Sequence, residues 1–241
     1  MLWYKSWLET RTRFFIALLG ISALCLIRVY IGEIDVFTRL PLLRTVEYRT
    51  VLDEGHSMLC FLWMMGVILL TMGGLLREKA TGAAPFTLAL PVGRPRLLGT
   101  RIGMCLAEAV VLAIVPWIVM FLTASVFGEA VSLDQAGFLL ALLLSGGMVF
   151  FGVALLVSSL VEGEYTAPMV SFGVVFAGLM ALNSMSLDKY SPMHFASGGG
   201  LIDRHTGLVV GPIPWVHAVE WILLTVFLVA ISLFAIQCHE F

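Results

Sequence analysis

Long runs of apolar residues, separated by short polar segments, dominate the chain. A membrane-spanning helix needs about 20 mostly apolar residues to cross roughly 30 Å of hydrocarbon. Six stretches approach or reach this length: 14–31, 57–76, 102–127, 137–161, 166–184 and 217–237. The pattern predicts an all-α integral membrane protein with six transmembrane helices, forming a single transmembrane domain over residues 1–241.

The composition favours the same class. Apolar residues make up 60% of the chain and charged residues 12%, whereas soluble domains carry roughly 25% charged residues. The four cysteines, Cys25, Cys60, Cys105 and Cys238, lie in or at the ends of different spans. Without paired spacing they predict neither a disulfide framework nor a zinc site, and we expect buried apolar residues.

Lys and Arg near span ends set the orientation. With six spans, the two termini share a side with the loop at 77–101, and this side carries eight of the 14 basic residues. We therefore expect both termini in the cytoplasm and the chain in the inner (plasma) membrane. The first outer loop is long and charge-balanced, so we expect it to cross the membrane as a small folded segment.

Two further segments differ from plain spans and loops. Residues 2–13 mix Trp and Tyr with charged residues, which is typical of a helix lying in the membrane interface. Residues 185–216 combine Gly and Pro with frequent apolar residues, which makes this outer loop a candidate re-entrant segment. Non-helical backbone at such depth must be shielded by protein or water.

No catalytic or nucleotide-binding motif is present. The five histidines are scattered without an H-E-x-x-H pair, and no G-x-x-x-x-G-K-[ST] loop occurs. We expect each histidine to be a satisfied or solvent-facing side chain. The chain is therefore not predicted to be an enzyme, and any ATP and Mg would bind to another subunit.

Glu108 is the one carboxylate well inside a predicted span. Placing a charge there costs at least about 2.5 kcal/mol, so such a residue is by default a candidate for function. The alternative is a structural contact with a neighbouring helix, or a position at the interface near Arg101. Pro116, farther along the same span, predicts a bend, and the two residues are candidates to line a transport path.

The loop at 77–101 carries five of the 14 Lys and Arg residues. It opens with Arg77, Glu78 and Lys79, continues with the apolar segment 86–90, and closes with Pro91 to Arg96. A basic loop with its own apolar patch, held at a membrane surface, is suited to contact a cytoplasmic partner.

This loop resembles the cytoplasmic loop between the second and third spans of type-2 ATP-binding cassette (ABC) permeases, the membrane subunits of many exporters. In that family a Glu is followed by a Gly-Thr pair, a leucine-rich segment, Leu-Pro-Val/Leu-Ser-Arg and a basic start to the next span. Glu78, residues 87–92, Arg94 and Arg96 match, while Thr81-Gly82 stands for the pair and Gly93 for the Ser.

Shorter similarities extend along most of the chain. They comprise the aromatic and charged N-terminal segment, Ser158-Ser159-Leu160, and Ser191-Pro192 followed by Phe195, whereas Glu162 and Glu164 stand where relatives often carry basic residues.

The resemblance implies a permease that pairs with a second identical or homologous permease and docks on two cytoplasmic ATP-binding subunits. The residues implied to couple it to the ATPase are Arg77, Glu78, Phe86, Leu88, Leu90, Pro91, Arg94 and Arg96. Substrate would move by alternating access, and no nucleic acid is expected as a partner. The substrate is open. The alternatives are a regulatory or assembly membrane protein without transport, and a polytopic membrane enzyme.

Overall fold

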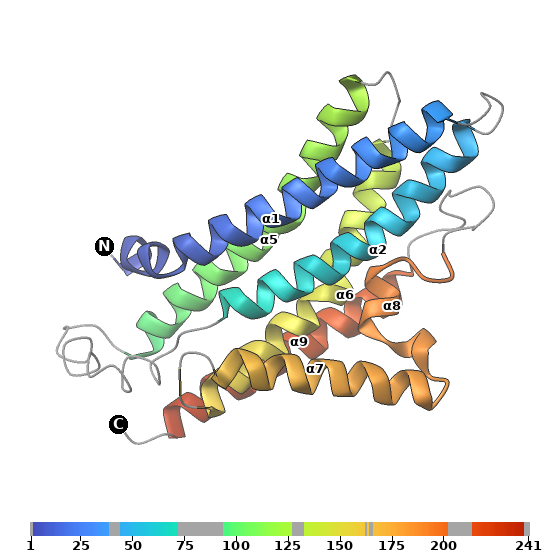
Figure 1. Cartoon of the computed structure of the whole chain (residues 1–241). Helices are drawn as coiled ribbons and strands as arrows, with labels where there is room; N and C mark the ends of the chain where they lie inside the picture. Colours follow the sequence, from blue (N-terminus) through green and yellow to red (C-terminus); the bar gives the residue numbers. More distant parts are fainter. Residues whose placement is uncertain are drawn as a thin grey trace.

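A computed structural model describes residues 2–38, 44–71, 94–126, 133–161, 163, 166–201 and 214–238. The regular elements of this part are all helical (Figure 1), as the apolar pattern predicts. They are α1 (Leu2–Thr38), α2 (Arg44–Leu70), α5 (Arg94–Val126), α6 (Leu133–Leu160), α7 (Thr166–Ser184), the 3₁₀ turn η2 (Asp188–Tyr190), α8 (Pro192–Ala196) and α9 (Trp215–Cys238).

Within the described ranges, five segments are long and apolar enough to cross a membrane: Leu2–Ile27, Arg96–Thr123, Leu133–Leu160, Thr166–Ser184 and Trp215–Ile236. Helix α2 contributes a shorter apolar segment, His56–Leu70. Several such helices in one chain indicate a multi-pass membrane protein. The predicted membrane class is thereby confirmed.

The helices coincide with the predicted spans but are mostly longer. Helix α7 has the predicted bounds, whereas α1, with 37 residues, is about 55 Å long at 1.5 Å per residue. Residues 72–76 of the second predicted span lie outside the described residues, and α2 itself ends at Leu70. The first outer loop, expected to be a small folded segment, is formed largely by helix ends, because α1 continues to Thr38 and α2 begins at Arg44.

Successive long helices run in alternating directions (Figure 1), so that α1, α5 and α7 oppose α2, α6 and α9. Three contacts define the end of the bundle where α1 begins: Glu9 to Arg101 at 3.4 Å, Ser158 Oγ to the Thr71 carbonyl at 3.2 Å, and Ser232 Oγ to the Leu155 carbonyl at 3.2 Å. Together with the helix directions in Figure 1, these contacts place the start of α1, the end of α2, the start of α5 and the ends of α6 and α9 at one end.

The core is centred on Trp63 of α2, which is fully buried. Its Nε1 donates a hydrogen bond to the Ala109 carbonyl of α5 at 2.9 Å. On the other side it packs against Gly147 of α6, where an added Cβ would lie 2.5 Å from Trp63 Cζ3. The small residues in the middle of α6 thus allow close helix packing, as the sequence indicates.

The chain between α7 and α9 folds back onto the bundle. Ser191 caps α8 by accepting a hydrogen bond from Met193 N at 3.2 Å, and α8 packs against α6 at Gly146, where an added Cβ would lie 2.8 Å from Phe195 Cδ1. Gly146 is the fourteenth residue of α6, so α8 lies roughly 20 Å from the start of that helix.

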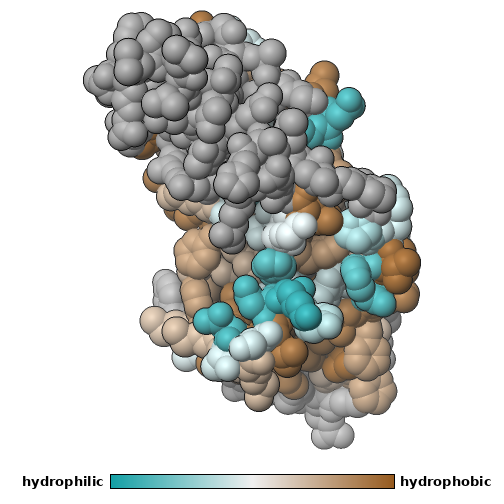
Figure 2. Space-filling model, turned by 90° about the vertical axis from the view of Figure 1, so that its right-hand side faces the viewer, coloured by the Kyte–Doolittle hydropathy of each residue, from teal (hydrophilic) through white to brown (hydrophobic). Residues whose placement is uncertain are grey.

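Of the candidate re-entrant segment, residues 202–213 lie outside the described part. The described residues 183–190 are exposed. Figure 2 views the molecule from the end of the bundle where α7 passes into η2, and it shows hydrophilic surface gathered amid hydrophobic surface.

Candidate functional site

The most unusual polar group in the described bundle is Glu108 of α5. It is 2% exposed, and its Oε1 is hydrogen-bonded to the Thr10 hydroxyl of α1. Its other oxygen, Oε2, has no hydrogen-bond partner among the described residues. The side chain of Glu108 thus contacts a neighbouring helix, and its role in function stays a prediction.

Thr10 and Ser6 lie one turn apart on the face of α1 that meets α5. The Thr10 hydroxyl lies 3.2 Å from the Ser6 carbonyl oxygen. Both residues are buried, and within the described structure the Ser6 hydroxyl has no partner. Two partnerless oxygens, Ser6 Oγ and Glu108 Oε2, therefore lie on either side of Thr10, although buried polar groups are usually paired.

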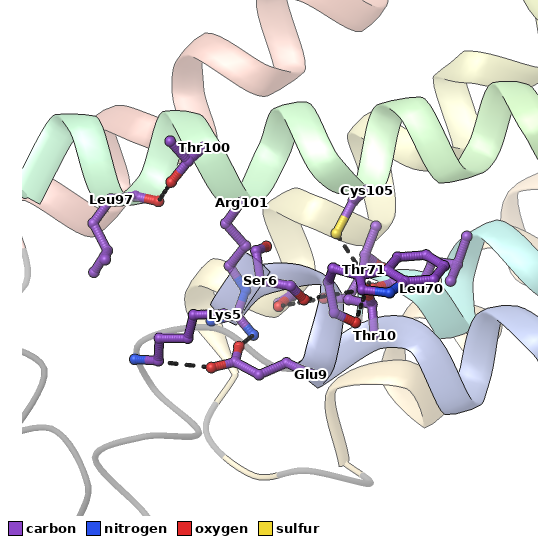
Figure 3. Close-up of polar contacts among 12 residues, drawn as sticks. Lys5, Ser6, Glu9, Thr10, Leu70, Thr71, Leu97, Thr100, Arg101 and Cys105 are labelled. Atoms are coloured by element: carbon purple, nitrogen blue, oxygen red, sulfur yellow. Dashed lines mark hydrogen bonds and ion pairs between the residues drawn. The ribbon is translucent and has the colours of Figure 1, made fainter. Parts of the chain in front are cut away.

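Charged side chains lie between the first turns of α1 and α5 (Figure 3). Arg101 of α5 pairs with Glu9 of α1 at 3.4 Å, and Glu9 also lies 3.8 Å from Lys5. The side chains of Arg101, Glu9 and Lys5 are 17%, 29% and 42% exposed. Exposure thus rises stepwise from the buried carboxyl of Glu108 to the surface.

A small pocket of about 20 Å³ lies among these residues. It is lined by Leu2, Lys5, Ser6, Glu9, Leu97, Leu98, Thr100 and Arg101. A volume of roughly 10–15 Å³ is enough to hold one water molecule. The pocket therefore has space for a water beside Ser6. We refer to Ser6, Thr10 and Glu108, together with this pocket, as the α1–α5 polar site.

Pro116 lies farther along α5 and is buried in a different environment. Its neighbour Trp117 contacts His56 of α2, with ring centroids 5.7 Å apart. His56 is fully buried, and its Nε2 lies 3.1 Å from the Ala196 carbonyl oxygen of α8. Pro116 is eight residues from Glu108, so the two lie about 12 Å apart along the helix.

The prediction that histidines are satisfied or solvent-facing is confirmed for three of them. His56 bonds Ala196, whereas His194 and His217 lie 3.7 Å and 2.9 Å from Asp188 and Glu220. His205 and His239 are outside the described residues. Within the described ranges, no group of three or more His, Cys, Asp or Glu side chains could hold a metal ion.

Most of the predicted coupling residues lie outside the described part of the chain, namely Arg77, Glu78, Phe86, Leu88, Leu90 and Pro91. Arg94 is the first residue of α5, although its side chain is not described. Arg96, in the first turn, is exposed. The described remainder of the coupling segment is thus continuous with the helix that carries Glu108 and Pro116.

A larger groove of about 420 Å³ separates α6 from the start of α9. It is lined by Ala141, Leu144, Ser145, Met148, Trp215, Ala218, Val219 and Ile222. Its one hydroxyl, Ser145 Oγ, donates to the Ala141 carbonyl of its own helix at 2.7 Å. Neither Glu108 nor Pro116 lines this groove, so the two predicted path residues and this apolar groove are separate features.

Comparison with known proteins does not assign the chain to a family. No family model matches the chain, and no curated protein matches it either.

Glu108 is recognisable from the sequence, whereas its partner Thr10 and the neighbouring Ser6 are not. Ser6 and Thr10 are four residues apart, a spacing that places both on one helix face, and they lie in a segment otherwise rich in aromatic and charged residues. This spacing was the available signal. That the same face meets α5 at Glu108 depends on helix packing between residues 98 positions apart.

Proposed function

We propose that the chain is the membrane-spanning permease subunit of a type-2 ABC transporter, acting as an exporter. One observation carries the proposal together with the motifs of residues 77–101. Helix α2 ends and α5 begins at the end of the bundle where α1 begins and α9 ends (Figure 1). A connection between α2 and α5 that shares a side with both termini is what a cytoplasmic coupling loop requires.

In this proposal α2 is the remaining transmembrane helix, which gives six spans. The chain lies in the inner (plasma) membrane with both termini in the cytoplasm. The first turns of α1 lie in the interface. Two such subunits, identical or homologous, form the transport path, and separate cytoplasmic subunits bind ATP and Mg. Glu78, Arg94 and Arg96 make polar contacts with the ATPase, while Phe86, Leu88 and Leu90 enter an apolar groove on it.

Helix α5 is suited to carry the movement. It runs unbroken from Arg94 to Val126, a length of about 50 Å, so displacement of its first turn moves the whole helix. Closure of the ATPase pair would thus shift α5 as a rigid body. Because Glu108 and Pro116 are buried in contacts with neighbouring helices, we propose that they shape the transport path.

Co-purification tests the proposal. The intact protein is isolated in mild detergent beside a double variant, Leu90→Asp with Arg94→Glu, and bound subunits are identified by mass spectrometry. We expect an ATPase subunit with the intact chain and its loss from the variant. The matched control changes the same residue types at the opposite end of the bundle, Leu187→Asp with Lys189→Glu, where both side chains are exposed.

The control variant should keep the ATPase. Absence of an ATPase from every sample would contradict the permease proposal and favour the regulatory protein without transport. Retention of the ATPase by the coupling variant would place its binding surface elsewhere on the chain.

A further inference from the structure

We propose that Glu108 is a proton-binding site. In the packed state its carboxyl group is a neutral acid that bonds α1 to α5, and its proton exchanges with solvent through Thr10, Ser6 and the pocket beside them. The inference rests on the α1–α5 polar site and does not depend on the transporter proposal.

The first argument is the lack of a countercharge. Arg101, the nearest basic residue on α5 toward its start, is engaged by Glu9 at 3.4 Å, and no ion pair to Glu108 occurs among the described residues. An ionised carboxylate with 2% exposure and no cation at bonding distance is strongly disfavoured, because desolvating a charge costs far more than desolvating a neutral group. A bound proton removes this cost.

The second argument is the number of available protons. The Thr10 hydroxyl contacts three acceptors, the Ser6 and Trp7 carbonyl oxygens at 3.2 Å and 3.4 Å and Glu108 Oε1, yet a hydroxyl has one proton to donate. If Thr10 donates to Ser6, the bond between Thr10 and Glu108 requires a proton on Glu108. A neutral Glu108 donating to Thr10 therefore keeps the interhelical bond and leaves the Thr10 proton for a carbonyl of its own helix.

The third argument is access. Ser6 lines the pocket that has space for about one water, and the pocket also borders the partly exposed pair of Lys5 and Glu9. The Ser6 hydroxyl is buried without a partner among the described residues, and Ser6 lies one helical turn from Thr10. This arrangement gives the proton of Glu108 a path to the end of the bundle where α1 begins.

The charged and titratable groups around Glu108 come from α1 and α5. Glu9 and Arg13 of α1 and Arg101 of α5 lie close enough to the Cys105 thiol to act on it electrostatically, as Glu108 does. Lys5 lies farther out, beside Glu9. The side chains described in α2, residues 56–71, include no charged residue apart from His56 at the far end of that range, and those of α6 include Asp134 alone.

Infrared difference spectroscopy of the full-length protein in nanodiscs tests the proposal. The spectrum of the Glu108→Gln variant is subtracted from that of the unaltered protein at neutral pH. We expect the carbonyl band of a protonated carboxylic acid, which shifts after transfer into D₂O. The matched control, Asp134→Asn at the exposed start of α6, should leave this acid band in place.

Ser6→Ala tests the exchange path. It should keep the acid band but slow the exchange of its proton about fivefold, the factor that corresponds to loss of one hydrogen bond of about 1 kcal/mol. Carboxylate bands in place of the acid band would overturn the proposal. An acid band that exchanges equally fast in the Ser6 variant would overturn the path through the pocket. Size-exclusion chromatography verifies that each variant is folded.

Discussion

At the residue scale, the α1–α5 contact depends on a single hydroxyl. Thr10 is 1% exposed and is the one described hydrogen-bond partner of Glu108. Removing it leaves a carboxyl group buried with both oxygens unpaired. The energetic consequence is the desolvation cost of that group, not merely the loss of one bond.

We therefore expect Thr10→Val to destabilise the protein by about 1–3 kcal/mol, measured as a lower midpoint of thermal unfolding in detergent. The control is Thr123→Val in α5, because the Thr123 hydroxyl donates to the Val119 carbonyl of its own helix at 2.7 Å. It should change stability by less than about 0.5 kcal/mol. Equal losses in the two variants would show that the interhelical bond has no special role.

A second prediction concerns Gly147. Because an added Cβ would lie 2.5 Å from the ring of the fully buried Trp63, Gly147→Ala should destabilise the protein by roughly 1–3 kcal/mol through overpacking. Gly137→Ala on the same helix meets nothing within 4 Å. It should be neutral or stabilising by up to about 1 kcal/mol, from helix propensity. The same unfolding assay compares them, and a stable Gly147 variant would contradict the packing described here.

At the element scale, α8 contacts α2 through the backbone carbonyl of its last residue, Ala196. The Ala196 oxygen faces both His56 Nε2 at 3.1 Å and Cys60 Sγ at 3.4 Å. Both partners belong to α2 and are buried. These bonds, together with the close contact at Gly146, hold the chain between α7 and α9 against the middle of α6.

His56→Leu should loosen α8 and expose Cys60, which is 1% exposed in the packed state. We expect its alkylation by a maleimide to become about fivefold faster, for loss of one bond of about 1 kcal/mol. Peptide mass spectrometry follows each cysteine separately. Cys105, buried where α5 meets α2, is the internal control and should react at its original rate; unchanged Cys60 labelling would mean that packing alone holds α8.

The helices and their contacts could be predicted from the sequence to different degrees. Helix α7 has the predicted bounds because Thr166 and Ser184 delimit an uninterrupted apolar run. Helices α1 and α2 extend beyond their apolar runs, since charged sequence also forms helix and hydropathy does not detect it. The partners of Glu108 and of His56 lie 98 and 140 residues away in sequence, so only the packing of the helices could identify them.

At the scale of the whole molecule, one property connects the fold to the proposed function. The coupling segment, residues 77–101, must lie on the same side of the membrane as the two termini, and η2 must lie on the opposite side. Arg96, in the first turn of α5, and Lys189, in η2, are exposed, so each provides a position for a reporter. The native cysteines with described side chains, Cys25, Cys60 and Cys105, are buried and should contribute little background.

The most direct test is the labelling of Arg96→Cys and Lys189→Cys, each in a Cys238→Ser background, by a membrane-impermeant maleimide. The six-span arrangement predicts that Lys189→Cys reacts in intact cells, whereas Arg96→Cys reacts only after the membrane is opened. Reaction of both positions from outside, or of neither, would contradict an odd number of crossings between them. Reaction of Arg96→Cys alone in intact cells would reverse the orientation and exclude a cytoplasmic ATPase as the partner of the 77–101 segment.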